Sequence, residues 1–223
     1  MTGETQDILY YLNEADEIVT VNSAWNRFAR ENGAPGVLAH NVQWRSLWEF
    51  INDGTTSLIC RRLIRRARQG GNVDFCFRCD APDTIRLARL RMRCQRGGLV
   101  EICVRTIGSI RRRPLPIAPA QRSFTGLAQW CSWCQRIEVA PGEWFVAEDA
   151  IREMASASWQ YPIRVRAGSC PDCVARMIAI ADFERANAPI VPPLLWPPQP
   201  VRVARRRPSW SMLPARIRVA GGA

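Results

Sequence analysis

Two Cys-x-x-Cys pairs constrain this 223-residue chain more than any other feature of its sequence. The first is Cys131-Ser-Trp-Cys134 and the second is Cys170-Pro-Asp-Cys173. A Cys-x-x-Cys turn directs two sulfur atoms toward one point, and four thiolates are the ligand set of a closed, tetrahedral structural zinc site. The sequence therefore predicts that the fold brings two distant turns together around one zinc ion.

The residues around the two pairs predict a small zinc module over residues 124–186. Short strands are expected at residues 136–139 and 144–146, on either side of an Ala-Pro-Gly-Glu turn. Helices are expected at residues 147–157 and 174–185, where apolar residues recur at helical spacing. A knuckle, a hairpin, a second knuckle and a helix in this order make a treble-clef-like module.

Other uses of these cysteines stay open at this point. Disulfides suit exported proteins, but Met1–Asp7 is polar and acidic, unlike the basic and apolar start of a signal peptide. A thiol redox pair at Cys131 and Cys134 explains one motif and leaves the second idle. Because no apolar run approaches the ~20 residues of a transmembrane helix, we expect a cytoplasmic protein with reduced thiols.

The N-terminal part, residues 1–108, predicts an α+β fold. Strands are expected at residues 8–12, 18–21, 73–79, 85–94 and 99–106, and the longer helices at residues 24–31 and 55–68. The 85–94 segment alternates apolar residues with arginines, and a one-residue slip near Ala88 indicates a bulge. Long strands with one charged face predict an antiparallel sheet with one face on a core and one in water.

This order of elements resembles that of small bacterial PAS-domain proteins. The similar stretches are Leu12–Asn22, Ala24–Trp25, Phe28–Ala29, Glu31–Gly33, Ser46–Trp48, Phe50–Ile51 and Cys79–Asp80. The two cysteine motifs are similar to a zinc module that follows sensory domains in bacterial signalling proteins. The resemblance implies a five-stranded antiparallel PAS-like sheet with flanking helices, then the zinc module and an extended basic tail, in a protein of signal transduction.

A PAS domain holds its ligand between the inner face of the sheet and the helices, so the resemblance implies a set of pocket-lining residues. These are Trp25, Phe28, Leu47, Trp48, Phe50, Leu63, Phe75 and Leu90. They either enclose a small ligand, whose identity the sequence does not give, or fill the core alone. Cys76-Phe-Arg-Cys79 lies on a predicted strand, where positions i and i+3 face opposite sides and do not hold one metal ion.

The net charge of +11 is concentrated outside the two predicted domains. The linker at residues 109–123 has four arginines and no acidic residue, and the tail at residues 187–223 has six arginines and eight prolines. A segment of that composition does not bury a core of its own and is expected to be disordered unless a partner binds it. Its candidate partner-binding residues are Trp196, Arg202, Arg205, Arg206, Arg207 and Trp210.

These features together predict a non-enzymatic sensory or regulatory adaptor. His40 is the only histidine, and no catalytic triad or phosphate-binding loop is found in the sequence. The PAS-like part is expected to sense a ligand or dock a protein, and the basic tail to bind an acidic partner. Analogy with PAS domains implies a homodimer through the sheets. The alternatives are a nucleic-acid-binding zinc regulator, acting through the basic linker and tail, and a thiol redox sensor.

Overall fold

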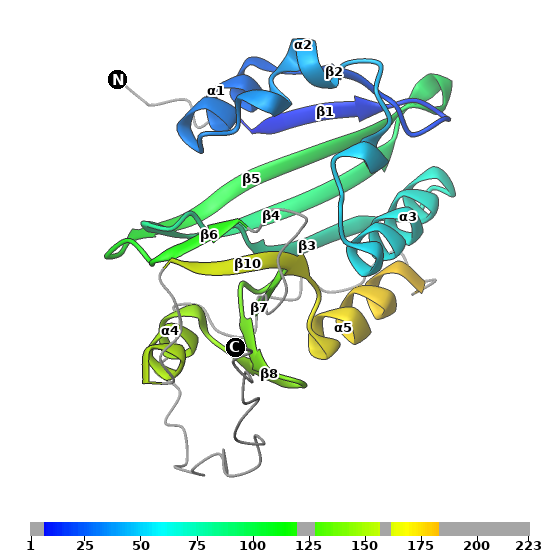
Figure 1. The fold of residues 1–223 in the computed structure, drawn as a ribbon. Coiled ribbons are helices and arrows are strands. Elements are labelled where there is room, and N and C mark those ends of the chain that lie inside the picture. The colour runs from blue at the N-terminus through cyan, green and yellow to red at the C-terminus, as the bar shows by residue number, and fades with distance from the viewer. Residues whose placement is uncertain (1–6, 120–127, 157–161, 183–223) are drawn as a thin grey trace, which may run out of the picture.

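A computed structural model describes residues 7–119, 128–156 and 162–182 of the chain. The N-terminal part contains an antiparallel sheet with the strand order β2-β1-β5-β4-β3, with three helices beside it (Figure 1). The strands are β1 (Ile8–Leu12), β2 (Ile18–Val21), β3 (Val73–Arg78), β4 (Thr84–Cys94) and β5 (Val100–Arg111). The helices are α1 (Ser23–Glu31), α2 (Ala39–Val42) and α3 (Gly54–Arg68). This is the predicted PAS-like α+β architecture.

Local sequence signals account for where these elements begin and bend. The side chain of Asn22 accepts a hydrogen bond from the backbone of Trp25 and caps α1, as expected for asparagine at this position. A register shift occurs between Leu87 and Ala88, as expected, but its extra residue is Ile107 of β5, and β4 itself keeps an unbroken register with β3. Asp53 caps α3, because its carboxylate accepts hydrogen bonds from both the backbone N–H and the hydroxyl of Thr56.

The C-terminal part contains a second five-stranded sheet, with the order β6-β10-β7-β8-β9. Its strands are β6 (Ile117–Pro119), β7 (Ala128–Cys131), β8 (Ile137–Ala140), β9 (Glu143–Phe145) and β10 (Ile163–Gly168). The predicted β8–β9 hairpin is confirmed, and α4 (Ala147–Ser156) packs on this sheet through Ala150 and Met154. Helix α5 (Pro171–Asp182) follows β10.

Two strands of the second sheet differ from the sequence-based expectation. Strand β10 was not expected, and it runs parallel to both β6 and β7. The expected linker also contributes to both sheets, because residues 109–111 continue β5 and residues 117–119 form β6. The predicted tail at residues 187–223, with its arginines and tryptophans, lies outside the described residues.

One hydrophobic core joins the two parts of the molecule. The buried cluster around Leu63 and Phe75 extends without a break to Trp133, Cys173 and Met177 of the C-terminal part. Helix α5 lies alongside α3 (Figure 1), and Arg62 forms an ion pair with Asp182 between them. The two parts are therefore packed against each other through a shared hydrophobic core. Within the described residues, no helix has the length and apolarity needed to cross a membrane.

Candidate metal centre and inner cavity

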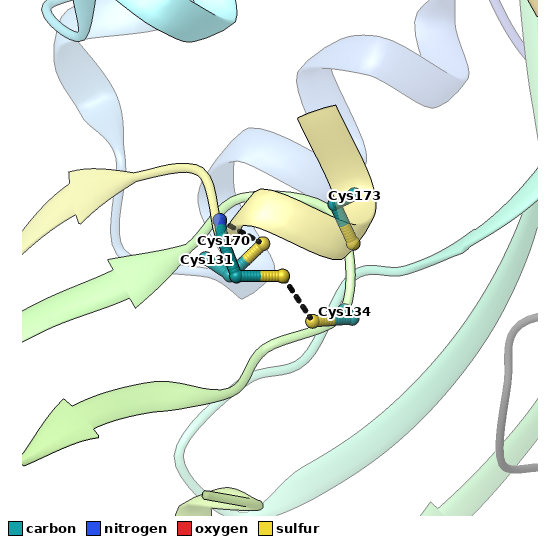
Figure 2. A group of neighbouring side chains, drawn as sticks. All are labelled: Cys131, Cys134, Cys170 and Cys173. Atoms are coloured by element: carbon teal, nitrogen blue, oxygen red, sulfur yellow. Dashed lines mark hydrogen bonds between the residues drawn. The ribbon is translucent and has the colours of Figure 1, made fainter. Parts of the chain in front are cut away.

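Four cysteine side chains converge at the junction of the two parts (Figure 2). Cys131 ends β7, Cys134 lies in the turn before β8, Cys170 precedes α5, and Cys173 lies in the first turn of α5. Their sulfur atoms all lie within 4.8 Å of one another. We call these four residues the cysteine quartet. The two Cys-x-x-Cys pairs thus meet as the sequence predicts.

The backbone of each motif explains how it presents its sulfur atoms. In the first, Gln135 adopts the left-handed conformation with φ 63°, and its N–H donates to the carbonyl of Cys131. In the second, Pro171 begins α5, so Cys170 and Cys173 lie one helical turn apart on the same side. The N–H of Cys170 also donates to the sulfur of Cys131 across 3.4 Å, which links the two motifs directly.

The distances within the cysteine quartet fit a tetrahedral metal site. Zinc–sulfur bonds of about 2.3 Å place the sulfur atoms of a tetrahedron about 3.8 Å apart. The sulfur atoms of Cys134 and Cys170 lie 3.7 Å apart. These two residues come from different motifs, so the approach is not a consequence of either turn alone. Four sulfur donors fill a tetrahedral ligand shell and leave no position for a reacting water.

Arg136 compensates part of the negative charge that four thiolates would carry. Its Nε and Nη2 donate to the sulfur atoms of Cys134 and Cys170, each across 3.3 Å. Nη2 also pairs with Asp172 at 2.7 Å. The pKa of Cys134 lies below its ordinary value because Cys131 and the other thiols, and then Arg136, donate to its sulfur. Sequence reasoning missed Arg136, although it lies only two residues after a ligand candidate.

Trp133, which lies between Cys131 and Cys134, packs into the core of the PAS-like part. Trp133 lies edge-on to Phe75, with ring centroids 6.0 Å apart, and its carbonyl accepts from the N–H of Arg78 on β3. Its indole Nε1 donates to the hydroxyl of Ser169, which lies 3.0 Å from the hydroxyl of Thr56. The cysteine quartet is thereby connected to β3 and to the first turn of α3.

An inner cavity of about 330 Å³ lies between the PAS-like sheet and α1. Trp25, Phe28 and Leu90 line it, in agreement with their predicted position. Tyr10, Phe77 and Cys79 also line it, and the sequence analysis did not include them. Phe77 could have been found, because it lies two residues after Phe75 on the same face of a strand.

The other predicted lining residues lie elsewhere in the core. Leu63 and Phe75 are fully buried where α3 packs against the sheet, and Leu47 is also buried. The ring of Trp48 lies under the guanidinium of Arg61, and the ring of Phe50 lies under that of Arg45. The inner face of the sheet therefore has a solid half under α3 and a hollow half under α1.

Comparisons with solved structures give several domains that each cover about half of this chain. The PAS domain of the RpfR quorum-sensing receptor of Cronobacter turicensis, in complex with C12:0, has 15% identity and a TM-score of 0.36, covering 48% of this chain and 100% of its own. A sensory box sensor histidine kinase of Vibrio cholerae has 12% identity and a TM-score of 0.33, covering 46% of this chain and 83% of its own.

A domain of an HTR-like protein of Haloarcula marismortui has 12% identity and a TM-score of 0.30, covering 46% of this chain and 98% of its own. No protein-family model and no curated protein matches the sequence. The assignment of a PAS-like fold therefore rests on the strand order and on the placement of the helices, as described above.

Proposed function

We propose that this protein is a non-enzymatic sensory or regulatory adaptor. In this proposal the inner cavity receives a small molecule, and a structural zinc ion bound by the cysteine quartet fixes the second sheet against the PAS-like part. The second sheet then offers the surface that a protein partner reads. Zinc is favoured over other metals because four cysteine sulfurs at tetrahedral spacing are its usual structural ligand set.

One observation carries this proposal, a row of three aromatic rings between the cavity and the metal ligands. Phe77 lines the cavity, and its ring centroid lies 6.2 Å from that of Phe75. Phe75 in turn lies 6.0 Å from Trp133, which stands between Cys131 and Cys134. Close-packed side chains transmit displacement to their neighbours. A ligand that moves Phe77 therefore has a packed route to the second sheet.

The test is native mass spectrometry of the full-length protein purified under reducing conditions. The proposal predicts a mass increment of one zinc ion per chain and additional occupancy by a small organic molecule. Zinc bound by all four cysteines would also leave none of them free for redox chemistry. A protein that contains no metal, and whose cysteine quartet reacts with an alkylating reagent as rapidly as the exposed Cys94, would contradict the proposal.

The proposed coupling has its own test in the same protein. Hydrogen exchange is measured at the first cysteine motif, with and without the co-purifying molecule, in the wild type and in Phe77→Leu. We expect the ligand to change exchange near Trp133 in the wild type and to change it less in the variant. Equal changes in both proteins would show that the aromatic row does not carry the effect.

A further inference from the structure

The walls of the inner cavity are uncharged, and the guanidinium of Arg86 contacts residues that line it. None of the residues that line the cavity is acidic or basic. Its polar groups include the Tyr10 hydroxyl and the Cys79 thiol. Burial raises the pKa of both groups, so both are neutral at ordinary pH. An interior of this kind accepts apolar matter and excludes an unpaired charge.

Arg86 is the cation that contacts the lining residues. It lies on the inner face of β4, two residues before Ala88 and four before Leu90, both of which line the cavity. Its guanidinium lies over the ring of Phe28 at 5.4 Å from the centroid. Its Nη1 donates to Asn32 Oδ1 at 3.0 Å. Nη1 also lies 3.5 Å from the carbonyl oxygen of Cys79, so three wall residues contact this side chain.

The position of Arg86 is held firmly, and its charge is not paired with a carboxylate of any described residue. Asn32 Nδ2 donates to the carbonyl of Phe28, which orients the amide so that its oxygen faces Arg86. The Nε and Nη2 groups of Arg86 donate to no described residue. By contrast, Arg78 and Arg89 on the same sheet each form a two-point pair with an aspartate. The guanidinium of Arg86 is thus held by Asn32 and Phe28, and the N–H groups of its Nε and Nη2 remain available to a ligand.

We infer that the inner cavity binds an amphipathic carboxylate, with its apolar body among Trp25, Phe28 and Leu90 and its head group on Arg86. A guanidinium presents parallel N–H donors that match the two oxygens of a carboxylate. The volume of about 330 Å³ lies near the small end of ligand sites, which favours a short apolar body. This inference depends on the proposed role of the cavity and adds the chemical class of its ligand.

The experiment compares decanoate with 1-decanol, which share a chain length and differ in the charge of the head group. Binding of each is measured by calorimetry on the full-length protein, below the concentration at which micelles form. Arg86→Gln removes the charge, and Arg93→Gln is the matched control, since Arg93 is exposed on the same strand and does not line the cavity. Ala88→Leu fills the cavity, and thermal unfolding checks that each variant is folded.

We expect the wild type to bind decanoate at least about tenfold more tightly than 1-decanol. Arg86→Gln should lose that preference, Arg93→Gln should keep it, and Ala88→Leu should bind neither probe. Equal binding of the two probes by the wild type, or unchanged decanoate binding by Arg86→Gln, would overturn the inference and leave the role of the cavity intact. Failure of the wild type to bind either probe would overturn both.

Discussion

The ring of Trp133 meets the ring of Phe75 edge-on, at 6.0 Å between centroids, and this contact joins the two parts of the molecule. In the sequence, Trp133 lies between Cys131 and Cys134. Phe75 is fully buried in the middle of β3. The first cysteine pair therefore flanks a side chain that packs into the PAS-like core.

Replacing Trp133 with alanine should destabilise the whole described body. The side chain is 7% exposed, and removing a buried tryptophan costs about 3–5 kcal/mol. Denaturant unfolding followed by far-UV circular dichroism measures the loss. Trp44→Ala is the control, because Trp44 is 66% exposed and should change stability by less than about 0.5 kcal/mol. Equal effects of the two substitutions would argue against the shared core.

Ser169→Ala should weaken the junction by a smaller amount. The hydroxyl of Ser169 accepts from the indole of Trp133 and lies within hydrogen-bond distance of Thr56. Its removal leaves a buried N–H without a partner, which costs about 1–3 kcal/mol. Ser109→Ala, at an exposed position on β5, should have no measurable effect in the same unfolding assay. An unfolding free energy unchanged by Ser169→Ala would show that this link does not contribute.

Cys170→Ser should abolish metal binding. Cys170 is 1% exposed and belongs to the quartet that we propose as the ligand set, and serine is a poor ligand for zinc at neutral pH. Elemental analysis by mass spectrometry should find one zinc ion per chain in the wild type and almost none in the variant. Cys94→Ser should retain the metal, because Cys94 is exposed and outside the cysteine quartet. Full zinc content in Cys170→Ser would contradict the ligand assignment.

Much of the PAS-like part follows from local signals in the sequence. The alternation of apolar residues and arginines from Ile85 to Arg93 predicts a long strand, which is observed as β4, although its buried residues lie on both faces. The two cysteine motifs also identify the four cysteines of the quartet, and the fold then brings the two motifs together. Such features depend on a few neighbouring residues, and the sequence displays them directly.

The features that the sequence analysis missed depend on contacts between distant segments. Ile163, Val165 and Ala167 alternate with Arg164 and Arg166, a strand-like pattern, but nothing in it indicates parallel pairing with β6 and β7. Likewise, no local pattern shows that Trp133, between Cys131 and Cys134, packs on Phe75, nearly 60 residues earlier. The division of the inner sheet face into solid and hollow halves also depends on where α1 and α3 pack.

The Asp7–Arg105 pair should make stability depend on pH. Arg105 donates to both carboxylate oxygens of Asp7, at 2.8 and 2.7 Å, and its hydrogen bonds lower the pKa of Asp7 from 3.8. A carboxyl with a lowered folded-state pKa stabilises the fold above its unfolded-state pKa, and this contribution is lost as the pH falls through the folded value.

Asp7→Asn should therefore reduce the free energy of unfolding at pH 7 by a few tenths to about 1 kcal/mol, since Arg105 is exposed to solvent. The difference from the wild type should disappear in acid, below the folded-state pKa. Glu143→Gln, at an exposed position, is the control and should show no such pH dependence. A deficit of Asp7→Asn that persists undiminished in acid would assign its effect to packing rather than charge.

The most direct test of the proposed architecture is hydrogen exchange on the full-length protein before and after zinc is removed by a chelator. The cysteine quartet is packed against the PAS-like core through Trp133 and Ser169. We therefore predict that metal loss reduces protection in β7 and α5, and also in β3 and the first turn of α3. Loss of protection confined to residues 128–182, with β3 and α3 unchanged, would contradict the account of a metal centre that joins the two parts.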